Sequence, residues 1–155
     1  MNHRAIAIQV VCDLESHLSE LLSAFFVSRN PHISHETALG ELYSDGRVLS
    51  SLRKMADVAL YLGLISQEQR FDLKSLSKLR DCYAHGRNLK QLADEPQLFA
   101  LVTKTNLYRG NASDLAGLDQ QAVFMCVKEQ LVVDLKERLN SFNASVGGSS
   151  NGGAA

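Results

Sequence analysis

The chain has 155 residues, of which 45% are hydrophobic and 21% are charged, and its formal net charge is −1. This composition is typical of one globular domain rather than a disordered chain, and no apolar run reaches the roughly 18 residues that a membrane span needs. The small net charge argues against attraction of the whole molecule to nucleic acid or to an anionic membrane.

The N-terminal segment predicts a helix over about residues 4–27. Its apolar side chains recur at alternating steps of four and three and form one stripe, which indicates a core helix or a dimer seam. Pro31 ends the helix, because proline disfavours helical conformation in the residue before it. Asp13 and Glu15 interrupt the apolar stretch too early for a signal peptide, so we expect a cytoplasmic protein.

A short helix is predicted within residues 32–43, with Ser34 as its N-cap. The next helix, over about residues 49–64, is apolar on most of its circumference, which is typical of a central helix. Gly63 near its end is expected to permit close packing. The following helix is predicted from Gln67 to about Ala84.

This charged helix, residues 67–84, has recognisable signals at both ends. Ser66 and Gln69 form a capping-box pattern at its start, and Gly86 suits a left-handed C-cap at its end. At about 100° per residue, Arg80 falls within the apolar face of the helix. An arginine placed there needs a partner, for which Asp57 or Asp13 is expected.

The C-terminal third predicts one short helix opened by Asp94, a loop over residues 106–118 and a long helix over about residues 119–142. No alternating strand pattern occurs anywhere in the sequence. The predicted fold class is therefore all-α: a single helical bundle of about five main helices without a sheet, over residues 1–143. The Gly- and Ser-rich residues 144–155 are predicted to be a disordered tail.

The three cysteines are an odd number, scattered over three predicted helices, which favours reduced core thiols over disulfides. They lack the paired spacing of a zinc site. His32 and His35 form a His-x-x-His pattern that we interpret as solvated surface. We therefore expect no metal and no cofactor. The cysteines are Cys12, Cys82 and Cys126.

The charge is unevenly distributed along the chain. Residues 47–90 contain nine basic and four acidic side chains, a net charge of +5, so the remainder carries −6. This asymmetry indicates either an anionic partner or contact with acidic helices of the same fold or of a second copy. The candidate anion-binding residues are a helical stripe and one residue beyond it: Arg70, Lys74, Lys78 and Arg87. The alternative for the stripe is a solvated helix face.

Three stretches between residues 45 and 86 together form a recognisable sequence pattern. They are the turn Asp45-Gly46, the apolar helix end Ala59-Leu60-Tyr61-Leu62-Gly63-Leu64-Ile65 and the charged helix end Leu79-Arg80-Asp81-Cys82-Tyr83-Ala84-His85. This part of the chain resembles the mannitol operon repressor family of bacterial proteins. The resemblance implies an all-helical, dimeric bacterial regulator without a recognised DNA-reading motif.

The same charged helix end also resembles the Arg-x4-His signature of HEPN ribonucleases, which are helical dimers. That resemblance implies that Arg80 and His85 are catalytic, that Asp81 orients one of them, and that RNA is the partner. Histidine can move protons on and off the 2′-hydroxyl, and arginine can stabilise a charged phosphorane. Five residues on one helix separate them by about 140°, so we expect them to converge only if the helix ends before His85 or if a dimer joins two copies.

Two hypotheses follow. The first is a regulatory protein that acts as a homodimer through contacts with an unidentified protein partner, with the motif serving mainly to hold the helix end. The second is a metal-independent ribonuclease, so the sequence leaves enzymatic activity open. A sequence-specific DNA binder ranks last, because no helix concentrates Arg, Asn and Gln.

Overall fold

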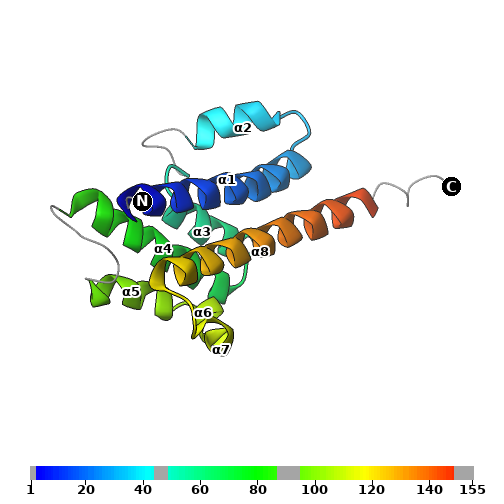
Figure 1. Ribbon diagram of the computed structural model, residues 1–155. Coiled ribbons are helices and arrows are strands. Elements are labelled where there is room, and N and C mark those ends of the chain that lie inside the picture. The colour runs from blue at the N-terminus through cyan, green and yellow to red at the C-terminus, as the bar shows by residue number, and fades with distance from the viewer. Residues whose placement is uncertain (1–2, 44–48, 87–94, 149–155) are drawn as a thin grey trace.

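The computed structural model describes residues 3–43, 49–86 and 95–148, and over these ranges it has eight helices and no strand (Figure 1). This confirms the predicted all-α bundle. Among the described residues, no helix combines the length and the apolar character that crossing a bilayer requires. The helices are α1 (His3–Arg29), α2 (His35–Leu42), α3 (Leu52–Tyr61), α4 (Gln67–His85), α5 (Pro96–Thr103), α6 (Asn106–Gly110), α7 (Ala112–Leu115) and α8 (Gln120–Gly148).

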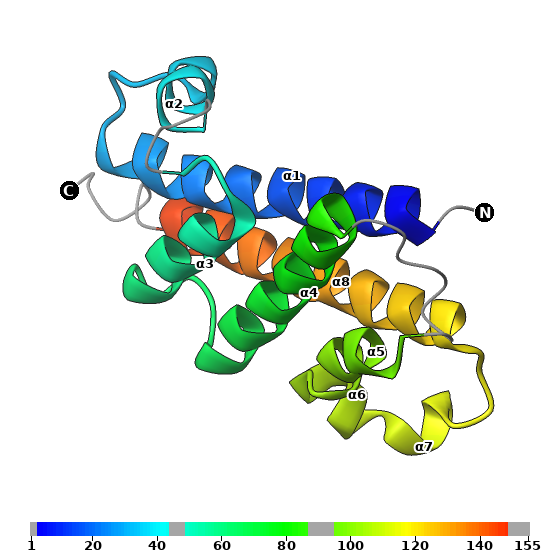
Figure 2. The same ribbon diagram turned by 90° about the vertical axis from the view of Figure 1, so that its left-hand side faces the viewer.

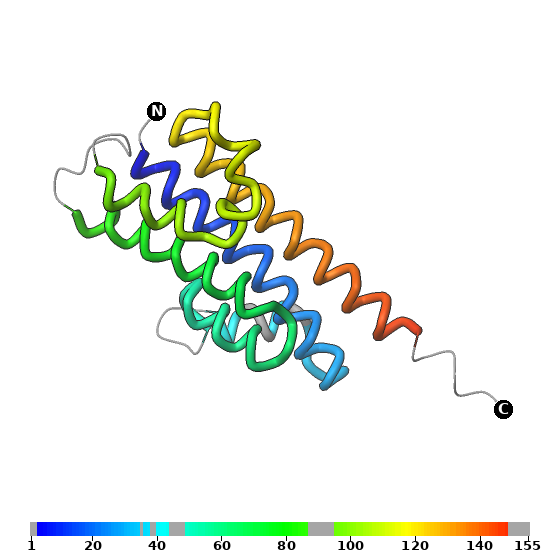
Figure 3. The backbone as a smooth tube through the Cα atoms, turned by 90° about the horizontal axis from the view of Figure 1, so that it is seen from below, coloured from blue at the N-terminus to red at the C-terminus, as the bar shows by residue number. Residues whose placement is uncertain are grey.

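The central element is α1, which packs against α2, α3, α4 and α8. Figure 3 shows it between α4 and α8. Its predicted stripe is the middle of the core, and Leu14, Leu18, Leu21 and Leu22 are fully buried. The prediction that the helix over residues 49–64 is central was wrong. That helix, α3, is shorter and buries one face only, because its other face carries charged residues exposed to solvent.

The longest helix, α8, lies along α1 (Figures 1 and 2). Lys128 of α8 is buried and joins the two helices through its Nζ, which lies 3.0 Å from Asp13 Oδ2. The helix was predicted to end at residue 142, but it continues to Gly148. Within this last part of α8, Ser145 Oγ donates a hydrogen bond to the carbonyl of Phe142 at 2.7 Å. Of the tail predicted as disordered, residues 144–148 are thus helical and residues 149–155 lie outside the described range.

The connection between α3 and α4 is a defined turn. Gly63 has φ +73° and follows the last turn of α3, and the N–H of Leu64 donates to the carbonyl of Ala59 at 2.9 Å. This is a Schellman motif, in which glycine supplies the left-handed residue. Gly63 therefore ends α3 and does not mediate close packing, since a Cβ there would have no neighbour within 4 Å.

Both ends of α4 can be compared with their predicted signals. The capping box is confirmed: Gln69 N–H donates to Ser66 Oγ at 3.1 Å, and Ser66 N–H donates to Gln69 Oε1 at 2.9 Å. The predicted left-handed cap at Gly86 was wrong, because Gly86 is extended at φ −73°. The helix continues one residue further than predicted and includes His85.

Residues 106–118 were predicted to form a loop, but the structure has α6 and α7 there. The reason is a carboxylate from another helix. Asp72 of α4 is buried and accepts hydrogen bonds from the backbone N–H groups of Asn106 at 2.7 Å and Leu107 at 3.1 Å. Thr105 Oγ1 accepts a third, from Tyr108 N–H at 3.2 Å. The start of α6 is therefore capped from α4, which sequence periodicity does not show.

The helix predicted to open at Asp94 is α5, which begins at Pro96 with Glu95 as its N-cap; Asp94 lies outside the described residues. All three cysteines are free and lie in helices. Their predicted core position was wrong for two of them, because Cys12 and Cys126 are exposed and Cys82 is half-buried.

Candidate functional site

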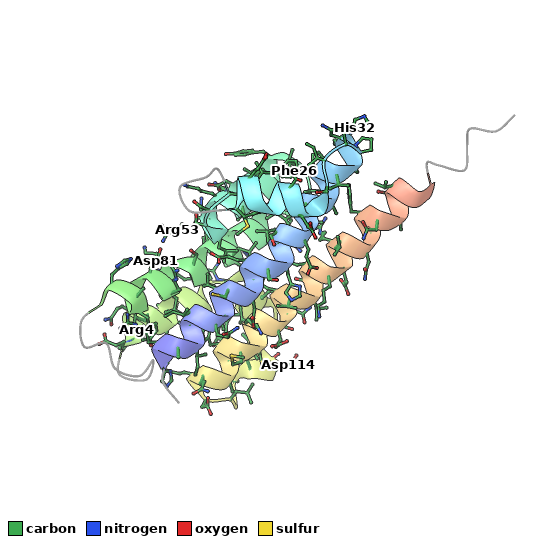
Figure 4. The ribbon with its side chains drawn as sticks, turned by 90° about the horizontal axis from the view of Figure 1, so that it is seen from above. Arg4, Phe26, His32, Arg53, Asp81 and Asp114 are labelled. Carbon is green, nitrogen blue, oxygen red and sulfur yellow. The ribbon has the colours of Figure 1, made fainter. Side chains whose placement is uncertain are left out.

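The charged motif lies in the last two turns of α4, beside α3 and the start of α1. Figure 4 shows Arg53, Asp81 and Arg4 along one side of the molecule. The Asp81 carboxylate binds two guanidinium groups: Oδ1 accepts from Arg80 Nη1 at 3.0 Å, and Oδ2 lies 3.0 Å from Arg53 Nη2. These side chains are half-exposed, at 40% for Arg80, 44% for Arg53 and 34% for Asp81. Asp81 thereby joins α3 to α4.

The predicted partners of Arg80 were wrong, because both carboxylates are occupied elsewhere. Asp57 lies 2.7 Å from Arg70 Nε and 2.9 Å from Lys74 Nζ. The hydrogen bond from Lys74 is the largest cause of a lowered Asp57 pKa. Burial acts in the opposite direction, and the hydrogen bond from Arg70 lowers the pKa further. Asp13 is bound by Lys128, whose hydrogen bond is the largest cause of a lowered Asp13 pKa.

A second carboxylate, Glu15 of α1, lies close to this cluster. Its Oε1 accepts a hydrogen bond at 3.2 Å from the backbone N–H of Leu52, the first residue of α3. Burial raises the pKa of Glu15, while the bond from Leu52 and the positive charge of Arg80 act in the opposite direction. Glu15 therefore both holds the start of α3 and offsets part of the positive charge of Arg80.

His85 is the last residue of α4 and its side chain is exposed. Because the helix includes both residues, Arg80 and His85 point about 140° apart, and one copy of the chain does not bring them together. Asp81 and His85, four residues apart, share a face of α4. Within one chain, the residues that contact each other are Arg80, Asp81 and Arg53. The sequence did not indicate Arg53.

The end of α4 has one more contact, from the N-terminal turn of α1. Arg4 Nη2 donates to the carbonyl of Ala84 at 3.5 Å. A cation at a helix C-terminus stabilises the negative end of the helix dipole. Arg4 therefore links the start of α1 to the residue before His85.

The candidate anion-binding residues divide into three groups. Arg70 and Lys74 share the carboxylate of Asp57, whereas Lys78 is exposed. Arg87 lies outside the described residues. The first three line a groove of about 390 Å³ between α4 and α5, to which Lys104, the C-cap residue of α5, adds a fourth cation. Sequence reasoning missed Lys104, because nothing in the local pattern shows which face of α4 the next helix meets.

The Asp81 cluster, which consists of Arg53, Arg80 and Asp81, can join two helices and can also bind an anion. Two guanidinium groups held by one carboxylate keep a fixed spacing, and each retains N–H groups that can donate to a further acceptor. The exposed side chain of His85 lies one helical turn from Asp81. Comparisons with known protein families, with curated proteins and with solved structures found no match.

Proposed function

We propose that this chain is a bacterial regulatory protein of the mannitol-repressor type that acts as a homodimer through protein–protein contacts. The observation that carries the proposal is the double pairing of Asp81 with Arg80 and Arg53. In this arrangement the motif serves to join α3 to α4, as expected if it is structural. The charges of Arg80 and Asp81 compensate each other within the chain, so the motif itself attracts an anionic polymer only weakly.

The outer face of α3 is the contact surface that we assign to the protein partner. It carries Arg53 and Lys54, which are exposed, and ends at Tyr61, which is 79% exposed. Tyrosine and arginine are among the residues enriched in binding hot spots, and exposed tyrosine offers a large contact area with few rotatable bonds. The ion pair with Asp81 restricts the Arg53 side chain on this face.

A gene-deletion experiment tests the regulatory proposal in a bacterium that carries the gene. Deletion is expected to change the transcript level of a small set of genes, and the wild-type chain and His85→Ala are both expected to restore it. The double variant Lys54→Glu/Tyr61→Ala is expected to fail, because it alters the α3 face and leaves the core unchanged. Unchanged transcripts after deletion would contradict the proposal.

A second candidate function is a metal-independent ribonuclease of the HEPN type, and one observation favours it. Arg80 is 40% exposed rather than buried against a carboxylate of another helix, and His85 is exposed. Asp81 holds the guanidinium of Arg80 in one orientation. A dimer that faces the two α4 ends toward each other would place His85 of one copy near Arg80 of the other, and this arrangement overcomes their angular separation within one helix.

RNA cleavage by purified protein separates the two candidates. If the second is correct, Arg80→Ala and His85→Ala each abolish cleavage. Mixing the two variants then restores about a quarter of wild-type activity, because a randomly mixed dimer population contains one intact composite site in every second dimer. Equal background cleavage by wild type and both variants would exclude the ribonuclease and leave the regulatory proposal standing.

A further inference from the structure

A groove between α4 and α5 lies apart from the Asp81 cluster and has no part in the proposed function. Its volume is about 390 Å³, which is within the range of small-molecule sites. Most of its lining comes from one face of α4, and α5 closes the other side. Its cationic and apolar side chains are Arg70, Phe71, Lys74 and Lys78 of α4, and Leu101 and Lys104 of the α5 side.

The groove is strongly cationic. Arg70 and Lys74 are held in place by their shared bonds to Asp57, at 2.7 and 2.9 Å. Lys78 and Lys104 are exposed, and within the described part of the chain neither forms an ion pair. Four lining cations, of which Arg70 and Lys74 share the carboxylate of Asp57, leave a net charge of +3. In a chain with a net charge of −1, this concentration of positive charge attracts anions locally.

The groove is also partly apolar. Phe71 is 49% exposed, although it lies in the second turn of a helix whose other large apolar residues are buried. Leu101 adds an aliphatic surface on the opposite wall. An aromatic ring beside several cations matches a ligand with a flat π-system and phosphate groups, because bases stack on aromatic side chains and phosphates bind lysine and arginine. Gln67 and Ser75 line the same groove and can donate to ribose or base edges.

The two walls are held at a fixed separation. Lys104 immediately precedes Thr105 and Asn106, and Asn106 is bound by Asp72 of α4 through its backbone N–H at 2.7 Å and its side chain at 3.0 Å. The cation of the α5 wall is therefore tied to the helix that forms the α4 wall. Two walls that are already in place avoid the entropy cost of ordering the backbone on binding.

From this arrangement we propose that the α4–α5 groove binds a nucleoside phosphate, with the base on Phe71 and the phosphates at Lys74, Lys78 and Lys104. The ligand is either a free nucleotide or a nucleotide within single-stranded RNA, which share this chemistry. Binding weakens as the salt concentration rises, because the cations are near the surface.

Isothermal titration calorimetry of the full chain tests the proposal with ATP, sodium triphosphate, adenosine and a short single-stranded oligoadenylate. ATP is expected to bind, and adenosine and triphosphate are expected to bind at least about tenfold more weakly, since each lacks one half of the contacts. The double variant Lys78→Glu/Lys104→Glu and the variant Phe71→Ser are each expected to lower ATP affinity about tenfold or more. Lys136→Glu, an exposed lysine of α8, is the matched control and leaves the affinity unchanged.

The substituted side chains are all on the surface, and circular dichroism of each variant verifies that it is folded. Equal affinity for ATP and the oligonucleotide assigns the site to free nucleotides, and tighter oligonucleotide binding assigns it to RNA; both support the chemistry proposed. Absence of binding by ATP and oligoadenylate at millimolar concentration would overturn it. The proposal would also be overturned if Lys78→Glu/Lys104→Glu lowered the ATP affinity no more than Lys136→Glu does.

Discussion

Replacing Asp72 with alanine should destabilise the fold more than any other single carboxylate change described above. Asp72 is 1% exposed and accepts three hydrogen bonds, two from the backbone N–H groups that start α6 and one from the Asn106 side chain. Asp72→Ala leaves both backbone donors without their acceptor. Losing a helix cap costs about 1 kcal/mol, and each buried donor left unsatisfied costs about 1–3 kcal/mol.

The net cost is smaller than the sum of these contributions, because the carboxylate itself is poorly solvated. Burial raises the pKa of Asp72, and the hydrogen bonds from Asn106 and Leu107 only partly offset it. Removing the charge relieves that desolvation. We therefore expect Asp72→Ala to lower the free energy of unfolding by about 3 kcal/mol, and Asp72→Asn, whose amide oxygen still accepts, by about 1 kcal/mol.

Urea denaturation followed by circular dichroism at neutral pH measures both values. Asp134→Ala is the matched control, since Asp134 also accepts a side-chain hydrogen bond, from Gln130 at 3.0 Å, but on the exposed surface of α8. Its expected effect is within about 0.5 kcal/mol of zero. An Asp72→Ala variant no less stable than Asp134→Ala would refute the assignment of Asp72 as the cap of α6.

The pH dependence gives an independent test of the same residue. Because the pKa of folded Asp72 lies above its ordinary value of 3.8, the folded state binds the proton more tightly than the unfolded state. The stability contributed in this way is fully present below pH 3.8 and is lost as the pH rises through the raised pKa. The stability of wild type relative to Asp72→Asn should therefore increase as the pH falls from 7 to 4. A decrease would contradict the raised pKa.

Three further predictions concern stability. Gly63→Ala should lower the free energy of unfolding by about 1 kcal/mol, because Gly63 has φ +73°. Gly40→Ala inside α2 should raise it by about 0.5 kcal/mol, because alanine is more stable than glycine within a helix. Denaturation midpoints that shift in the same direction would contradict this. Tyr83→Phe should be neutral or stabilising by up to about 1 kcal/mol, because the buried Tyr83 hydroxyl has no hydrogen-bond partner within the described residues; thermal unfolding measures it, and a clear loss of stability would refute it. Asp57→Asn should destabilise the chain at neutral pH but not in acid: the pKa of Asp57 is lowered, chiefly by Lys74, so its contribution is present above pH 3.8 and is lost as the pH falls through the lowered pKa. Acid titrations of wild type and variant that stay parallel would exclude this.

Local signals allowed much of the fold to be predicted. The leucine stripe of α1 and the capping box of α4 are properties of a few neighbouring residues, and both are confirmed. Thr105 is a local N-cap of α6, but two further N–H groups at the start of α6 are bound by Asp72, 34 residues from Asn106, and no local pattern predicts that contribution. Gly86 was predicted as a left-handed cap from its residue type alone, but the backbone there is extended.

The candidate site was predicted in part for the same reason. Its residues Arg80, Asp81 and His85 are adjacent in sequence, so the motif locates them. The partner of Arg80 could not be deduced, because neighbours on a helix do not ordinarily face each other, and yet Asp81 is the residue that binds it. Arg53 came from another helix and was missed.

The packing of α1 against α8 also has a consequence for the order of folding. The pair Asp13 and Lys128 joins the two helices across 115 residues of sequence. Contacts of such separation close late, since the entropy of the intervening chain must be lost first. We expect α1, α3 and α4 to associate early and α8 to dock last, so that until α8 is synthesised the leucine surface of α1 is open to chaperones or to aggregation.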